Sequence, residues 1–152
     1  MTFEDNIKQN NFILPKPVDP VGSYIAIKQV NNLLFVSGQI SIDEHGKPIK
    51  GKVGRDLNID DGYLAAQRCA LSIVSHVKKY LLDLSKIKSC IKLTGYVNSI
   101  DSFTDQPKVV NGASDTIVKI FGQNGMHARA AISSNSLPLG VSVEVDAIFE
   151  LN

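Results

Sequence analysis

The stretch VSVEVDAIFEL, residues 141–151, has the clearest periodicity in the sequence. Apolar residues occupy every second position from Val141 to Leu151, and the positions between them include Glu144 and Asp146. An alternation with a period of two is typical of a β-strand that buries one face. We therefore predict a long strand at the end of the chain, with a polar face that carries Glu144.

Two segments upstream of this strand show helical periodicity. Asn58 is a suitable N-cap, and two aspartates follow it in the first turn, where carboxylates interact favourably with the helix dipole. Apolar residues then recur at helical spacing as far as Leu81. Proline is tolerated in the first turn of a helix and glycine commonly ends one. A second helix is therefore predicted from Pro107 to Gly122 or Gly125.

Strands are predicted on both sides of these helices. Residues 91–97 and 127–134 form two of them, and residues 23–39 form a hairpin. Ile40 and Ile42 indicate one more short strand. The order β-β-β-α-β-α-β-β predicts an α+β fold, a two-layer sandwich of a mixed β-sheet with two helices on one face.

Length and composition favour one folded domain. The chain has 152 residues, of which 43% are hydrophobic and 20% charged, so it can bury a core without disulfides or a structural metal. We expect a single domain over residues 1–152. It would have an N-terminal extension over residues 1–20 and a long connection over residues 46–62.

Charge and cysteine content exclude several classes of protein. The net charge of +1 disfavours a dedicated nucleic-acid binder, which usually has a basic excess. Cys69 and Cys90 cannot form a disulfide framework or a C-x-x-C zinc site, and buried free cysteines are expected. No stretch has the length of a membrane span or the apolar core of a signal peptide. We expect a cytoplasmic protein that uses no metal and no cofactor.

The second face of the predicted sheet has no helix to cover it. Its positions include Ala130, Ile132 and Ile148 as well as charged residues. An apolar sheet face is usually covered by another subunit. The sequence therefore predicts a closed homo-oligomer.

An ordered set of motifs resembles the RidA/YjgF family. These motifs are Gly22-Ser23-Tyr24, Phe35–Gln39, Asn111, Ala128-Arg129, Leu137-Pro138 and Val143–Ala147. The resemblance extends from about Gly22 to Phe149. Phe103–Pro107, Asn111–Ser114 and His127–Arg129 are similar to the chorismate-mutase-like branch, which is also described as an endoribonuclease L-PSP branch.

The resemblance implies a homotrimer with ligand sites in the clefts between subunits. Members of the family hydrolyse reactive enamines and imines such as 2-aminoacrylate and 2-iminopropionate to 2-oxo acids and ammonia. The family pattern places the arginine that pairs with the substrate carboxylate at Arg129 and the glutamate that positions water at Glu144. Residues that line its pocket correspond to Tyr24, Ser37-Gly38 and Asn111.

These assignments agree with elementary chemistry, although structural roles for the same residues stay open. A guanidinium holds a carboxylate through two parallel hydrogen bonds, and Arg129 lies among alanines, so it is either an anion anchor or part of a structural ion pair. Glu144 activates water or lies on a solvated strand face. His127 is two residues from Arg129, so both point to the same side of a strand and His127 is a further candidate substrate contact.

Two positions depart from the family's deaminase pattern. Met126-His127 replaces an aromatic-proline pair, and Ala131 replaces a cysteine. Three functions therefore stay open. The first is a 2-iminobutanoate/2-iminopropanoate deaminase-like hydrolase, and the second is a non-catalytic binder of small carboxylates or keto/imino acids at trimer clefts. The third is an endoribonuclease, which the near-zero net charge disfavours.

Overall fold

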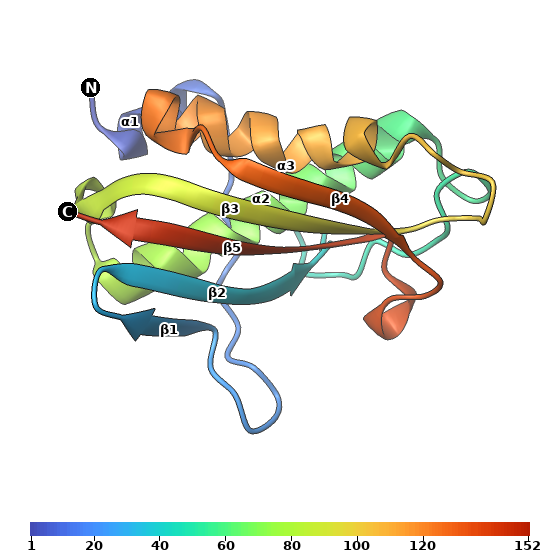
Figure 1. The fold of residues 1–152 in the computed structure, drawn as a ribbon, viewed down its shortest axis with the longest axis horizontal. Coiled ribbons are helices and arrows are strands. Elements are labelled where there is room, and N and C mark those ends of the chain that lie inside the picture. Colours follow the sequence, from blue (N-terminus) through green and yellow to red (C-terminus); the bar gives the residue numbers. More distant parts are fainter.

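The computed structural model describes residues 1–152 and has two layers, a five-stranded sheet and helices that cover one of its faces (Figure 1). The predicted α+β sandwich is confirmed. The helices are α1 (Phe3–Gln9), α2 (Ile59–Leu81) and α3 (Gln106–Phe121), and the strands are β1 (Ile27–Val30), β2 (Leu33–Ile40), β3 (Ile87–Asn98), β4 (Ala128–Ser134) and β5 (Val143–Leu151).

The sheet is mixed, as predicted, with the strand order β1-β2-β5-β3-β4. β3 and β4 are parallel, and the other neighbouring strands are antiparallel. The alternating segment at the end of the chain forms β5, which lies between β2 and β3. Its apolar positions face the helices, where Val143, Val145 and Phe149 have no exposed surface. The periodicity therefore identified the central strand.

Both predicted helices are present with the expected ends. Asn58 and Asp61 form a reciprocal capping box at the start of α2, and Gly122 caps α3. The two helices pack so closely that a Cβ atom at Gly112 would collide with the carbonyl oxygen of Tyr63. Only glycine permits this backbone contact, so Gly112 sets the separation of the helices.

The structure corrects the predicted order at the strand expected for Ile40 and Ile42. Ile40 ends β2, whereas Ile42 forms only an isolated bridge with Pro48. Proline has no amide hydrogen to continue a ladder, so the chain leaves the sheet there. The sheet consequently has five strands rather than six.

The connection expected over residues 46–62 ends at Asn58, the N-cap of α2.

A third helix, α1, lies within the segment expected to be a plain N-terminal extension. Thr2 and Asp5 form a capping box, and the Phe3 ring packs edge-on against Phe121 of α3 at a centroid distance of 4.9 Å. The Thr-x-x-Asp spacing carried the signal for this helix. The prediction of only two helices was therefore wrong.

Some polar and thiol side chains are buried behind the sheet. Cys69 and Cys90 are free and buried, as predicted, and burial raises the pKa of Cys90 to about 12. His76 was expected on the surface, but it lies on the inner side of α2 and is only 7% exposed.

None of the helices combines the length and apolar character needed to cross a bilayer.

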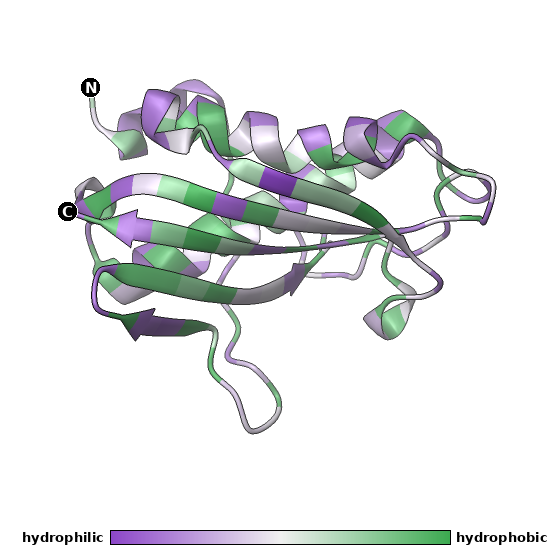
Figure 2. Cartoon of the chain, viewed as in Figure 1, coloured by the Kyte–Doolittle hydropathy of each residue, from purple (hydrophilic) through white to green (hydrophobic).

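The other face of the sheet is uncovered in this chain. Figure 2 shows that apolar and polar residues are mixed along the strands. Phe35, Ile91 and Ile132 are 42%, 40% and 48% exposed. The predicted apolar outer face therefore exists, with Ile132 among its exposed residues.

Candidate functional site

The sheet register places Arg129 and Glu144 on opposite faces. Arg129 is the β-partner of Leu93, a core residue on the helix side. Glu144 is the β-partner of Tyr96, three residues further along β3, and therefore lies on the uncovered face. The predicted site residues consequently form two clusters within one chain.

The first cluster holds the Arg129 guanidinium against the start of α3. Nη1 donates to Asn111 Oδ1 at 2.8 Å and to Ser114 Oγ at 3.1 Å. Nη2 is 3.4 Å from the carbonyl oxygen of Pro107 and donates to it. The predicted residues Arg129 and Asn111 therefore lie together, and these contacts fix the guanidinium plane.

His127 joins the same cluster through Ser114. Its Nδ1 lies 2.6 Å from the carbonyl oxygen of Gly125, and its Nε2 lies 2.9 Å from Ser114 Oγ. A carbonyl only accepts, so Nδ1 donates to Gly125, and Nε2 shares the second hydrogen bond with Ser114 Oγ. Ser114 Oγ then keeps a lone pair for Arg129. His127 thus fixes the orientation of Ser114.

The positive charge of Arg129 has no carboxylate partner in this chain. The ion pairs of the structure involve Arg55, Lys79, Lys88 and Lys108. Arg129 instead has neutral oxygen acceptors and lines an open depression next to His127 and Lys119. Arg129 therefore forms no ion pair within one chain.

The second cluster surrounds the carboxyl group of Glu144. A Cβ atom at Gly38 would collide with Oε1 of Glu144, so this glycine makes room for the carboxyl group over β2. Ser37 Oγ donates to the carbonyl oxygen of Ile25 at 2.7 Å, which fixes the segment that follows Tyr24. The pairing of β2 with β5 shifts register between Val36 and Gln39. This bulge brings Gly38 beneath the carboxyl group.

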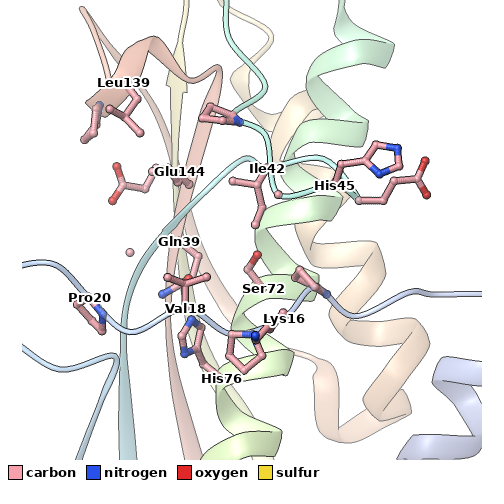
Figure 3. Close-up of a pocket in the computed structure, with 18 of the residues that line it drawn as sticks. Lys16, Val18, Pro20, Gln39, Ile42, His45, Ser72, His76, Leu139 and Glu144 are labelled. Carbon is pink, nitrogen blue, oxygen red and sulfur yellow. The ribbon is translucent and has the colours of Figure 1, made fainter.

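Burial raises the pKa of Glu144, and the nearby carboxylate of Asp146 raises it further. Glu144, Gly38 and Tyr24 line a cavity of about 590 Å³. Tyr24 is 58% exposed, so its ring borders the opening of the cavity. In Figure 3, β2 passes between Glu144 on one side and Ser72 on the other. A half-buried carboxyl group with a raised pKa is suited to proton transfer.

Some residues of these clusters were not identified from the sequence. Ser114 has no sequence signal beyond its place in the Asn111–Ser114 motif, and Ser72 lies within the apolar pattern of α2. The three histidines do not converge with other ligands, and no group of three or more His, Cys, Asp or Glu side chains is placed to hold a metal ion.

The mixed five-stranded sheet with helices on one face is the fold of a chorismate-mutase-like α+β protein. The family described as "YjgF/chorismate_mutase-like, putative endoribonuclease" matches residues 4–151, and the chain belongs to this family. Its curated relatives include Protein TCP17 of Trypanosoma cruzi, 40% identical over 97% of this chain and 92% of that protein. The RutC family protein y4sK of Sinorhizobium fredii is 30% identical, and the match covers 86% of this chain and 89% of that protein.

The crystal structure of Atu1372 from Agrobacterium tumefaciens, a protein described as having unknown function, has the same fold. It is 41% identical with a TM-score of 0.92 and covers 99% of this chain and 92% of that one. The similarity therefore extends over nearly the whole chain, including α1.

Proposed function

We propose that this protein hydrolyses reactive enamine and imine intermediates of 2-oxo acids to the 2-oxo acid and ammonia. Membership of the YjgF family supports a deamination role of this kind. The observation that carries the proposal is the Arg129 guanidinium, held by neutral acceptors and unpaired with any acid. A fixed guanidinium that forms no ion pair is suited to the carboxylate that every 2-imino acid carries.

Glu144 supplies the proton transfers of the proposed reaction. As a carboxylate it accepts a proton from water while the water oxygen bonds to the imine carbon, and the C=N bond becomes a single bond. The protonated Glu144 then returns this proton to nitrogen, which gives a carbinolamine. The Glu144 carboxylate next takes the hydroxyl proton and passes it to nitrogen as the carbonyl forms and the C–N bond breaks, so ammonia leaves and Glu144 is a carboxylate again. Partial burial favours the protonated carboxyl group that the second step requires.

The proposed site combines residues of two copies of the chain. Arg129 and Glu144 lie on opposite faces of one sheet, so they reach one small substrate only if Arg129 of one copy faces Glu144 of the next. The exposed residues Phe35, Ile91 and Ile132 give the uncovered face an apolar surface on which a second copy packs. We propose the homotrimer expected from the family resemblance, with Tyr24, Gly38, Asn111 and His127 around its clefts.

A binder of small carboxylates without turnover is the alternative, because Arg129 by itself suffices to hold a 2-oxo acid. The exposed Met126 favours this alternative, since it replaces the aromatic residue of the deaminase pattern beside the anchor. An endoribonuclease has less support because the net charge is +1, His76 is buried, and both ring nitrogens of His127 are engaged.

The test is to generate 2-iminopropanoate with an amino-acid oxidase and to measure its loss by semicarbazide trapping. Wild type should accelerate hydrolysis, and Arg129→Ala should abolish the acceleration. Lys119→Ala is a matched control, because it removes a cation from the same depression without touching the anchor. Acceleration that survives Arg129→Ala would exclude the assigned anchor. No acceleration by wild type, together with binding of pyruvate, would favour the binder.

A further inference from the structure

The cavity beside Glu144 continues around the free edge of β2 into a second part, here called the inner lobe. β1 pairs with β2 only as far as Val36, so the edge beyond it is open. The inner lobe is lined by Ser72 and His76 of α2, by Gln39 and Ile42, and by the proline-rich segment of residues 15–18. Figure 3 shows the Ser72 hydroxyl group pointing toward Ile42.

Ser72 is a buried polar group without a partner. Its side-chain oxygen forms no hydrogen bond, although the residue is only 4% exposed. An unsatisfied buried hydroxyl costs about 1–3 kcal/mol, so such groups are rare in folded proteins. Ser72 Oγ has almost no solvent-accessible surface, so a ligand atom reaches it only when neighbouring side chains of the lining shift, and such an atom would complete its hydrogen bonding.

The segment that covers the inner lobe is tied to α2 along its length. Ser75 Oγ donates to the carbonyl oxygen of Pro15 at 2.6 Å, and Arg68 Nη1 donates to that of Ile13 at 3.2 Å. Lys79 forms an ion pair with Asp19. These contacts hold the covering segment in place against α2.

The lining indicates a ligand group that is uncharged and largely apolar. Pro15, Pro17, Pro48 and Ile42 supply apolar walls, and Ser72 lies at the depth of the lobe. Burial lowers the pKa of His76, which keeps the ring neutral. Lys16 and Glu44 carry opposite charges and are exposed. A buried charge near Ser72 would have no counterion.

We propose that the inner lobe receives the side chain of the 2-imino acid substrate, and that this side chain is long, uncharged and ends in a hydroxyl or similar group bonded to Ser72 Oγ. This inference rests on the proposed function, because it places the reacting carbon at Glu144. The whole cavity, about 590 Å³, is in the range of ligand pockets and is much larger than 2-iminopropanoate requires. An aromatic side chain with a phenolic hydroxyl combines an apolar body with one terminal hydrogen-bonding group, as this lining requires.

The first experiment measures binding of two stable 2-oxo acids that differ only in one hydroxyl, phenylpyruvate and 4-hydroxyphenylpyruvate, by calorimetry. Wild type should bind the hydroxylated compound about 2- to 10-fold tighter, the value of one net neutral hydrogen bond. Ser72→Ala should reduce this ratio to about one. Ser75→Ala, which loosens the covering segment, should change both affinities together and leave the ratio as in wild type.

A second variant tests the volume of the lobe. Ser72→Leu should weaken binding of phenylpyruvate relative to pyruvate by about tenfold or more, because the added side chain fills the space that the ring would occupy. Equal ratios in wild type and Ser72→Ala, or failure of wild type to bind either aromatic acid, would overturn the inference. Unaltered selectivity of a folded Ser72→Leu variant would also overturn it.

Turnover separates this inference from the proposed function. Imino acids made by the oxidase from alanine, phenylalanine and tyrosine are compared by semicarbazide trapping, and the tyrosine-derived imine should be the preferred substrate. If wild type accelerates none of them, the proposed deaminase fails, while the Ser72-dependent binding ratio still decides whether the lobe binds side chains. If turnover occurs without any preference linked to Ser72, the inference fails and the deaminase stands.

Discussion

Arg129 and Glu144 project from opposite faces of the same sheet, one toward α3 and the other toward the uncovered face. The resemblance to the RidA/YjgF family assigns both residues to one reaction. A side chain cannot pass through a hydrogen-bonded sheet, so the two groups meet only across an interface between copies of the chain. This relationship makes assembly a requirement of the proposed chemistry.

Complementation between inactive variants tests the shared site. Arg129→Ala and Glu144→Gln should each be inactive alone, whereas mixed assemblies obtained by co-expression should regain part of the wild-type rate. The reason is that one type of interface in a mixed assembly pairs an intact Arg129 with an intact Glu144. The measurement is imine hydrolysis by the purified mixed species. Activity no higher than that of the separate variants would show that the residues do not meet across an interface.

Removal of Ser114 should weaken the anchor without changing the chemical step. Ser114→Ala deletes the acceptor at 3.1 Å from Arg129 Nη1 and frees His127 Nε2. We expect KM to rise about 3- to 10-fold with kcat nearly unchanged, because Asn111 and Pro107 still hold the guanidinium and only part of its positioning is lost. Asp115→Asn is a contrasting variant, because Asp115 bonds to Tyr63 and its removal takes a negative charge from the same depression, so KM should not rise. A fall in kcat with constant KM would contradict a positioning role.

The raised pKa of Glu144 predicts a pH-dependent stability. Below the ordinary pKa of 4.5 the carboxyl group is protonated in both the folded and the unfolded state, so it does not change the free energy of unfolding. As pH rises through the raised pKa of the folded state, the group ionises more easily in the unfolded chain, and the folded state loses stability. Glu144→Gln should therefore match wild type near pH 4 and become more stable than wild type toward neutral pH. Urea unfolding at several pH values measures this difference.

Glu150, on the same strand, provides a control of opposite sign. Hydrogen bonding to Lys88 and Ser89 lowers the pKa of Glu150, so its carboxylate stabilises the folded state above the ordinary value of 4.5 and loses this effect as pH falls. Glu150→Gln should be less stable than wild type at neutral pH, with the difference vanishing in acid. The same pH trend in both variants would refute the assigned cause.

A methyl group at Gly38 should displace the Glu144 carboxyl group. Gly38→Ala places a Cβ atom against Oε1 of Glu144, and the flexible carboxyl end moves more easily than the backbone of β2. We expect at least a tenfold loss of imine hydrolysis with little loss of stability. Gly46→Ala is a contrasting substitution with open space around the new atom but a positive φ of 81°, so it should lower stability and leave the rate of the folded protein intact. Full activity of Gly38→Ala would argue against a role for Glu144.

A substitution at Gly112, between α2 and α3, should instead lower the stability of the fold rather than the rate of imine hydrolysis. Gly112→Ala forces a Cβ atom onto the carbonyl oxygen of Tyr63, and neither backbone yields easily. We expect a loss of roughly 1–3 kcal/mol in the free energy of unfolding, as for overpacked cores. Denaturant unfolding measures the change. Wild-type stability would show that α2 and α3 separate at low cost.

The sequence by itself determined the elements that depend on local pattern. The alternation over residues 141–151 reports β5 because a strand shows its two faces in turn, and Asn58 reports the start of α2 because a cap acts within one turn. The ordered motifs also indicated the family. The helix α1 could have been predicted in the same way, because its Thr2–Asp5 capping box is also a local pattern.

Only the tertiary structure decided which side chains meet. The strand at Ile42 failed because its partner is Pro48, and His76 is buried because the segment near Pro15, which is tied to Ser75 across 60 positions, covers that side of α2. The separation of Arg129 from Glu144 depends on the register of β3 with both neighbours. The residue pattern within one strand or helix determines which of its faces is apolar. Which other strands and helices it contacts depends on interactions between segments far apart in the sequence, and no local pattern encodes these.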